Sequence, residues 1–202
     1  MSGTLFIISA PSGGGKTSLV KTLLEAEHEV KLSVSHTTRR ARPGEMNGRD
    51  YHFVTPAEFE HMLAAGEFLE NAVIYGNRYG TSRKWIAEQL KHGCDILLEI
   101  DWQGAQQVRE LMPGTVSVFI LPPSLEALEQ RLKGRSQDSP EVVARRLAAA
   151  RQEIGHVGEF DYVIINEDFN RAAQDLVSII RAERLKLSRQ LARHAALINR
   201  LK

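Results

Sequence analysis

The sequence contains a single cysteine, Cys94, so the chain cannot form an internal disulfide bond. Cys94 stands in an apolar run, and we interpret it as a small core residue rather than as a nucleophile. The formal net charge is +1, which excludes binding of nucleic acid by bulk electrostatic attraction. No apolar run reaches the roughly 18 residues of a membrane span, and the N-terminus lacks the pattern of a secretory signal. We therefore expect a cytoplasmic protein that binds neither nucleic acid nor membranes.

Apolar residues make up 43% of the 202 positions, a composition and length that suit one domain with a sizeable core. The apolar runs that we expect to form strands are 5–9, 31–35, 95–100, 116–121 and 162–165. Most of these runs lack polar alternation, which is typical of parallel strands covered on both faces. The spacing of apolar residues between them predicts helices over 16–24, 124–132 and 140–154. This order predicts an α/β fold with a parallel sheet core and helices on both faces.

Residues 36–92 interrupt that alternation and predict a small α+β insert. Thr55 and Glu58 have the spacing of a capping box, and the helix they open should stop before Gly66. A strand is expected over 68–75, with Gly76-Asn77 as a hairpin turn and Ser82 as the cap of a helix ending near Gly93. We divide the chain into a core (1–35, 93–125 and 150–202), the insert (36–92) and an arginine-rich lid of about 126–149.

The stretch SAPSGGGKTS follows the first predicted strand and nearly matches the phosphate-binding loop G-x-x-x-x-G-K-[ST]. Ala10 stands where the motif has glycine, which costs little if its φ is negative, and Pro11 favours such an extended residue. Consecutive glycines let backbone N–H groups approach a phosphate, and the following helix N-terminus adds positive partial charge. The residues expected to bind the nucleotide are Ala10, Pro11, Ser12, Gly13, Gly14, Gly15, Lys16, Thr17 and Ser18. The alternative is a glycine-rich turn with an incidental lysine.

Two residues of this loop have specific expected roles. Lys16 can reach the β- and γ-phosphates, and the Thr17 hydroxyl can ligate Mg²⁺, with Ser18 as a second choice. Asp101 follows a buried strand, and proteins with a phosphate-binding loop place an acid at such a position, near Mg²⁺ or its water shell. Asp101 has an alternative role as the cap of a helix that starts at Trp102, and both roles are compatible.

Hydroxyl and guanidinium groups are concentrated between Ser35 and Tyr51, and they suit a second phosphate. The alternative is a solvated basic loop. Glu70 follows in the insert, and a buried carboxylate there could accept the N1–H and N2–H₂ donors of guanine, which adenine lacks. On the residues alone, we favour the interpretation of Glu70 as an ordinary surface glutamate.

The segment RLKGRSQDSPEVVARRL supplies arginines that could neutralise charge during phosphoryl transfer and close over the reaction. Arg145 lies four residues after Glu141, so a surface ion pair explains it. We favour Arg135 and Arg146 as catalytic.

Taken together, these motifs and FLENAVIYGNRYGTS, LLEIDWQGAQQV and DYVIINEDF resemble the guanylate kinases, closest to the bacterial enzymes, over essentially the whole length. The resemblance implies the P-loop nucleoside monophosphate kinase fold and transfer of the γ-phosphoryl of ATP to GMP, with Mg²⁺. It implies that the GMP phosphate is held by Ser35, Arg39, Arg42, Tyr51 and Tyr79. It also implies that Glu70 and Thr81 read the guanine, that Asp101 contacts the nucleotide or the magnesium shell, and that catalysis involves Lys16, Arg42, Arg135 and Arg146.

Two other functions are compatible with parts of the sequence. A kinase of sugar phosphates such as ribose bisphosphate shares the phosphate loop but does not need the segment from Glu70 to Thr81. A guanylate-kinase-like module that binds phosphopeptides typically has a damaged phosphate loop, whereas here Gly13 to Thr17 is intact.

The C-terminal segment 181–202 carries seven Lys/Arg and one Glu. Its apolar positions at helical spacing are Leu187, Leu191, Ala195, Ile198 and Leu201. We expect either a helix that packs on the chain's own core or one that joins copies into a homo-oligomer. Binding of nucleic acid by this helix lacks the support of interleaved aromatic residues.

Overall fold

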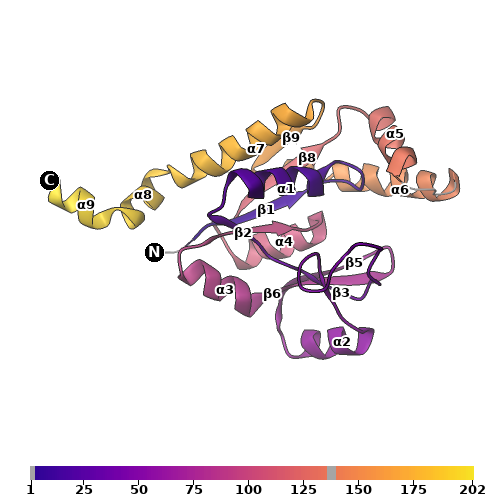
Figure 1. The fold of residues 1–202 in the computed structure, drawn as a ribbon, viewed down its shortest axis with the longest axis horizontal. Helices are drawn as coiled ribbons and strands as arrows, with labels where there is room; N and C mark the ends of the chain where they lie inside the picture. The colour runs from indigo at the N-terminus through magenta and orange to yellow at the C-terminus, as the bar shows by residue number, and fades with distance from the viewer. Residues whose placement is uncertain (1–2, 136–139) are drawn as a thin grey trace.

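The computed structural model describes residues 3–135 and 140–202, which form two sheets with surrounding helices (Figure 1). The larger sheet is parallel, with strands in the order β2-β7-β1-β8-β9. Its strands are β1 Leu5–Ser9, β2 Val30–Leu32, β7 Asp95–Glu99, β8 Val116–Leu121 and β9 Tyr162–Ile165. The predicted parallel core is confirmed, although β2 ends at Leu32 rather than at residue 35 because the chain leaves the sheet there for the insert.

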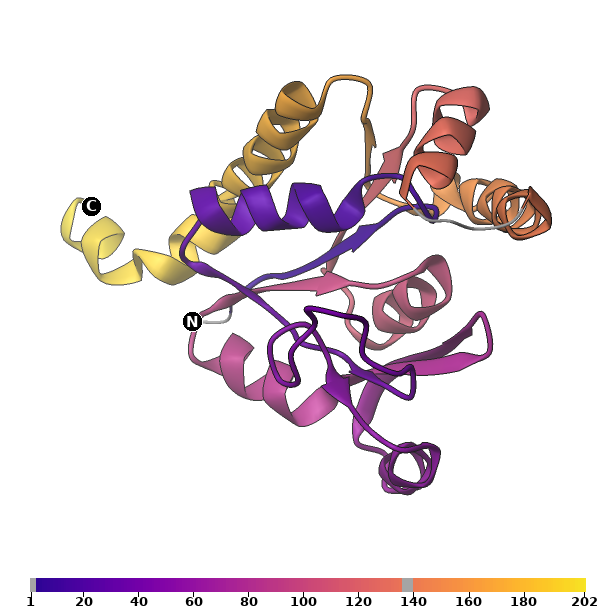
Figure 2. The ribbon, with the colours of Figure 1, turned by 45° about the vertical axis from the view of Figure 1, so that its right-hand side comes forward.

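Helices cover both faces of this sheet (Figure 2). Phe6 and Ile8 belong to the core cluster shared with α1 (Lys16–Ala26) and α7 (Phe169–Arg184). Leu5 and Ile7 belong to the opposite cluster, shared with α3 (Arg83–Lys91) and α4 (Trp102–Leu111). Because successive side chains of a strand point to opposite faces, a strand buried on both sides has no polar alternation, as the sequence predicted.

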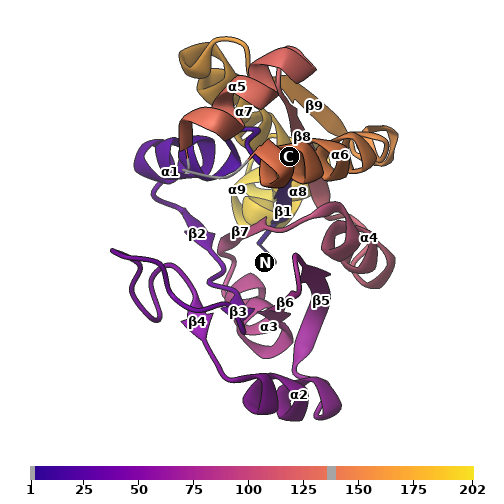
Figure 3. The same cartoon turned by 90° about the vertical axis from the view of Figure 1, so that its right-hand side faces the viewer.

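The second sheet lies within residues 36–82 and has the strand order β4-β3-β6-β5. Its elements are β3 His36–Thr37, β4 His52–Phe53, α2 Pro56–Ala64, β5 Phe68–Ile74 and β6 Asn77–Ser82. Helix α2 begins with the predicted capping box and lies on the side of this sheet away from the larger one (Figure 3). The predicted turn at Gly76-Asn77 is wrong by one residue, because Ile74 pairs with Asn77 and the turn is Tyr75-Gly76, both with positive φ.

Two helices pack together beyond β8: α5 (Leu125–Arg135) and α6 (Pro140–Ile154). They share a small apolar cluster of Leu128, Leu132, Val143 and Ala150. A 3₁₀ turn over Val157–Glu159 then leads to β9. The ring of His156 stacks on Trp102 at the start of α4, with ring centroids 3.6 Å apart, which joins the end of α6 to the core.

The C-terminal segment forms two short helices, α8 (Leu187–Arg193) and α9 (Ala195–Arg200), instead of one continuous helix. Leu187 is 73% exposed and Leu201 77% exposed, so these two side chains do not pack on the chain's own core. No helix in the described part of the chain is long and apolar enough to cross a membrane.

Candidate functional site

The glycine-rich loop joins the carboxyl end of β1 to the first residue of α1, Lys16. Gly13 and Gly15 have φ values of 89° and 94°, a backbone region that favours glycine. A side chain at Gly15 would collide with Nδ2 of Asn166, which donates to the Gly14 carbonyl at 2.9 Å. Within the described ranges Tyr75 is the one non-glycine residue with positive φ, so Ala10 is unstrained, as expected.

Lys16 and Thr17 face the carboxyl end of β7, the strand beside β1. Nζ of Lys16 donates to the Ile100 carbonyl at 3.1 Å, and the Thr17 hydroxyl donates to Oε1 of Glu99 at 2.5 Å. The sequence favoured Asp101 as the acid of this site, but the acid bonded to Thr17 is Glu99. Asp101 caps α4 by accepting from the Gly104 N–H at 3.0 Å, which confirms its alternative role.

Glu70 lies on β5 and is 3% exposed, so its interpretation as a surface glutamate is wrong. Its Oε1 accepts a short hydrogen bond from the hydroxyl of Thr81, which is itself fully buried on β6. Oε2 lies against Gly104 at the start of α4, where any side chain would collide with it. Burial raises the pKa of Glu70 to about 7, the charge of Asp101 adds to this, and Thr81 and Lys16 act in the opposite direction. The carboxyl group is therefore buried away from bulk water, between Thr81 on β6 and Gly104 on α4.

The second predicted phosphate site is formed by the segment from Ser35 to Tyr51 together with β6. The Arg39 guanidinium lies 5.2 Å from the ring centroid of Tyr51, and the rings of Tyr51 and Tyr79 are 5.9 Å apart. The Ser35 carbonyl accepts from the His52 N–H at 2.9 Å, which holds Ser35 beside Tyr51. Burial raises the pKa of Tyr51 to about 12, so its hydroxyl remains a donor at neutral pH. The side chain of Arg42 is exposed.

Ser12 in the glycine-rich loop lies against both α6 and the insert. Nη2 of Arg146 on α6 donates to its hydroxyl at 2.9 Å, and its N–H donates to Oε2 of Glu153 at 3.2 Å. Tyr75, at the tip of the β5–β6 hairpin, lies close enough to the Ser12 side chain for Ser12 to oppose the rise that burial causes in the pKa of Tyr75. Burial raises the pKa of Glu153, whereas the hydrogen bond from the Ser12 N–H and the charge of Lys16 act in the opposite direction. The side chain of Arg135, the other predicted catalytic arginine, lies outside the described residues.

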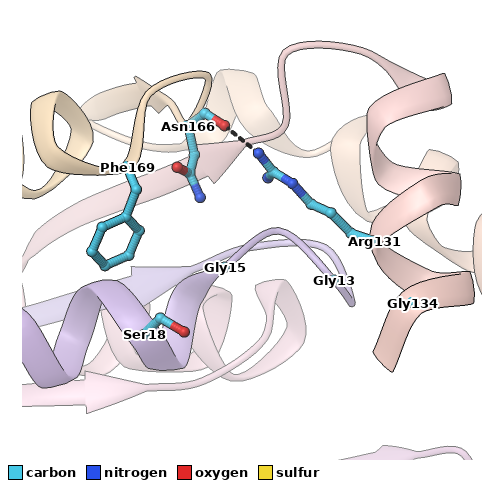
Figure 4. Close-up of a pocket in the computed structure, with 7 residues that line it drawn as sticks. All are labelled: Gly13, Gly15, Ser18, Arg131, Gly134, Asn166 and Phe169. Atoms are coloured by element: carbon cyan, nitrogen blue, oxygen red, sulfur yellow. Dashed lines mark hydrogen bonds between the residues drawn. The ribbon is translucent and has the colours of Figure 1, made fainter. Parts of the chain in front are cut away.

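A cavity of about 580 Å³ adjoins the glycine-rich loop at Gly13 and Gly15 (Figure 4). It is lined by Gly13, Gly15, Ser18, Arg131, Gly134, Asn166 and Phe169. Arg131 donates from Nη2 to the Asn166 carbonyl at 2.8 Å, and its buried Nη1 has no hydrogen-bond partner among the described residues. Such a cavity, with one aromatic ring and a few polar groups, can hold a planar base.

Sequence reasoning did not select three residues of this arrangement: Glu99, Glu153 and Phe169. Strand alternation places Glu99 on the face of β7 that packs toward α1, because Glu99 shares the parity of Leu97, a member of the cluster that contains α1. This signal does not by itself select Glu99, because Asp101 has the same parity. Glu153 and Phe169 have no comparable sequence pattern, because their positions depend on how α6 and α7 dock on the loop.

Comparison with known proteins gives consistent matches along the chain. The family model described as guanylate kinase matches residues 2–183. A guanylate kinase of Dechloromonas aromatica is 61% identical over 201 residues, covering 100% of both chains, and one of Vibrio parahaemolyticus is 55% identical, covering 98% and 97%. The crystal structure of guanylate kinase from Anaplasma phagocytophilum superposes with a TM-score of 0.82 at 39% identity, covering 99% of this chain and 96% of that one.

Proposed function

The chain belongs to the guanylate kinase family, and we propose that the sites on either side of Lys16 hold the two nucleotides of its reaction. That reaction is transfer of the γ-phosphoryl group of ATP to GMP, which gives ADP and GDP. The observation that carries the assignment is the buried pair of Glu70 and Thr81. Guanine offers two neighbouring donors on its pairing edge, and an ionised Glu70 offers two acceptor oxygens, whereas adenine lacks that pair of donors.

We assign the acceptor phosphate to Ser35, Arg39, Arg42, Tyr51 and Tyr79. Arg39 is oriented against the Tyr51 ring, and Tyr51 and Tyr79 supply phenolic hydroxyl groups. An arginine fork and hydroxyl groups match the oxygens of a phosphate monoester. In this assignment Asp101 lies beside the guanine, close enough to Glu70 for its negative charge to add to the rise that burial causes in the pKa of Glu70.

We assign the donor triphosphate to the loop from Ala10 to Ser18, with the adenine in the cavity beside Phe169. Lys16 then bridges the transferring phosphate, and Arg146 approaches it from α6, where it already contacts the loop at Ser12. Arg135 and Arg42 complete the set of cations that we propose. No general base is required, because the acceptor is an already ionised phosphate oxygen, and catalysis consists of positioning and charge neutralisation.

The oxygens of Thr17 and Glu99 suit Mg²⁺, which prefers hard oxygen ligands and keeps several waters. In the described part of the chain no three His, Cys, Asp or Glu residues form a metal-binding group, which agrees with an ion bound chiefly through substrate phosphates. We propose that Thr17 holds Mg²⁺ and that Glu99 holds it directly or through water, with Asp101 in its outer shell. When bound, the ion would neutralise charge on the phosphate oxygens.

We further propose that α8 and α9 join copies of the chain into a homo-oligomer in the cytoplasm, where its nucleotide substrates are. The exposed leucines Leu187 and Leu201 support this, because burying them against another copy removes apolar surface from water. Sedimentation should give an oligomer for the wild type and a monomer for Leu187→Glu. A wild type that sediments as a monomer at every concentration would remove the proposal.

The test of the reaction is ADP production from ATP and Mg²⁺ with GMP, AMP, UMP, CMP and ribose bisphosphate as acceptors. We expect strong turnover with GMP alone. Turnover with ribose bisphosphate would favour the sugar phosphate kinase instead. No turnover with any acceptor would favour the phosphopeptide-binding module, and phosphopeptide binding would then be measured.

A further inference from the structure

Glu45 is an acceptor for three N–H groups in the irregular segment 38–51. Nη1 and Nη2 of Arg39 each donate to its carboxylate at 2.9 Å, and the backbone N–H of Arg42 donates at 2.7 Å. The side chains of Arg39 and Glu45 are 14% and 19% exposed, so water screens this pair only in part. One carboxylate thus contacts two of the residues assigned to the acceptor phosphate.

The hydrogen bonds of Arg39 define which part of its guanidinium is available to a ligand. A guanidinium carries five N–H groups. Nη1 uses both of its N–H groups, one on Glu45 and one on the Arg40 carbonyl at 2.8 Å. Nη2 uses one on Glu45. Nε–H and the second N–H of Nη2 form the remaining edge of the plane, and no carboxylate or carbonyl oxygen of the described residues accepts a hydrogen bond from this edge.

The remaining neighbours of Arg39 indicate where this Nε–Nη2 edge is presented. The Tyr51 ring lies against the guanidinium, and the Tyr79 hydroxyl is near enough to raise the pKa of Arg39, after the larger effect of Glu45. The Arg39 guanidinium thus has Tyr51 and Tyr79 as neighbours, and each phenol carries a hydroxyl donor. Two parallel N–H groups together with hydroxyl donors match the oxygens of one phosphate.

We propose that Glu45 is a positioning residue that orients Arg39 so that its Nε–Nη2 edge faces the phosphate of the acceptor nucleotide. This inference rests on the proposed function of the site. It differs from a simpler role in which the Glu45 carboxylate occupies the place of the phosphate and is displaced by it. The two roles predict opposite effects when Glu45 is neutralised, because an orienting carboxylate assists binding and a competing one opposes it.

The first test is Glu45→Gln, which keeps the side-chain length but removes the charge and one of the two acceptor oxygens. We expect KM for GMP to rise about tenfold, the scale set by ordering a freed arginine side chain. We expect kcat and KM for ATP to stay within about twofold. Calorimetric binding of guanosine should be unchanged, because guanosine has no phosphate for Arg39 to contact.

A second test uses a double-mutant cycle with Arg39→Lys, which cannot make the bidentate pair. We expect the double variant Arg39→Lys/Glu45→Gln to bind GMP no more weakly than Arg39→Lys alone, because Glu45 acts through Arg39. Glu45→Asp keeps the charge and should recover part of the lost GMP affinity. Glu60→Gln is the matched control. Glu60 belongs to the same insert but forms its ion pair with Arg78, whose Nη2 lies 2.5 Å from Oε1 of Glu60, so this variant should behave as wild type.

Three outcomes would overturn the inference while leaving the proposed function intact. They are an unchanged or lower KM for GMP in Glu45→Gln, an equal loss of guanosine and GMP binding, and additive effects in the cycle. If the wild type itself fails to phosphorylate GMP, the proposed function fails instead. Circular dichroism of each variant checks that the chain is folded. If Glu45→Gln does not fold, the same measurements are made on Glu45→Asp.

Discussion

Replacing Glu70 with glutamine should make the stability of this protein less dependent on pH. Burial raises the pKa of Glu70 from 4.5 to about 7. Between these two values the folded chain binds a proton that the unfolded chain has released, so the free energy of unfolding falls as the pH rises. This loss of unfolding free energy is negligible below pH 4.5 and complete above pH 7, where it amounts to about 3 kcal/mol. Glu70→Gln keeps a neutral side chain at every pH and has no such loss.

The assay is urea unfolding of the wild type and of Glu70→Gln at pH 5 and pH 8. The advantage of the variant in free energy of unfolding should increase by about 2.5 kcal/mol between the two conditions. Glu25→Gln is the control, because Glu25 is exposed on α1 and its replacement should have the same effect at both pH values. Equal differences for Glu70→Gln at pH 5 and pH 8 would refute the reasoning that a dry site holds Glu70 partly protonated.

The same protonation should appear in the binding of GMP. The guanine donors need an ionised Glu70, so we expect GMP to bind the wild type about tenfold more weakly at pH 6 than at pH 8. The phosphate of GMP also titrates near neutral pH, but it does so equally with Glu70→Gln, and comparison of the two proteins removes that contribution. A wild type whose GMP affinity follows the same pH dependence as the variant would contradict the role of Glu70.

Three further predictions concern other parts of the molecule. Lys16→Ala should lower kcat by about 100-fold or more with little change in KM for GMP, because Lys16 acts on charge in the transition state; steady-state kinetics showing only a raised KM would count against this role. Gly104→Ala should raise KM for GMP and lower the free energy of unfolding by about 1–3 kcal/mol, because its Cβ collides with Glu70, whereas Gly158→Ala has open space and serves as control. Thr55→Ala should cost about 1 kcal/mol in urea unfolding through loss of the capping box of α2, with unchanged activity at 25 °C; a variant as stable as the wild type would show that the cap contributes nothing.

Elements fixed by local pattern could be predicted from the sequence. The strand limits 116–121 and 162–165, the helix limits 140–154 and the capping box at Thr55 agree with the structure. Each depends on residues close to one another in the chain: an apolar run, a helical period, or a hydroxyl three residues before a glutamate. The α/β class follows from their order.

Features fixed by distant contacts could not be predicted in the same way. The hairpin turn is displaced by one residue because its register depends on cross-strand pairs such as Glu70 with Thr81, and both candidate dipeptides contain Gly76. The choice between Glu99 and Asp101 depends on which acid faces α1. The burial of Glu70 requires α4 and β6 to close around it, and neither segment is adjacent to it in sequence.

The contacts of Ser12 have a consequence for how the two substrates influence each other. Arg146 and Glu153 contact this residue from α6, and Tyr75 lies beside it at the tip of the hairpin in the insert that carries Glu70 and Tyr79. A ligand that moves either region therefore changes the environment of the same loop. By thermodynamic linkage, any factor by which bound ATP changes the affinity for GMP must equal the factor by which GMP changes the affinity for ATP. Ser12 is a place where such cooperativity between donor and acceptor can be measured and altered.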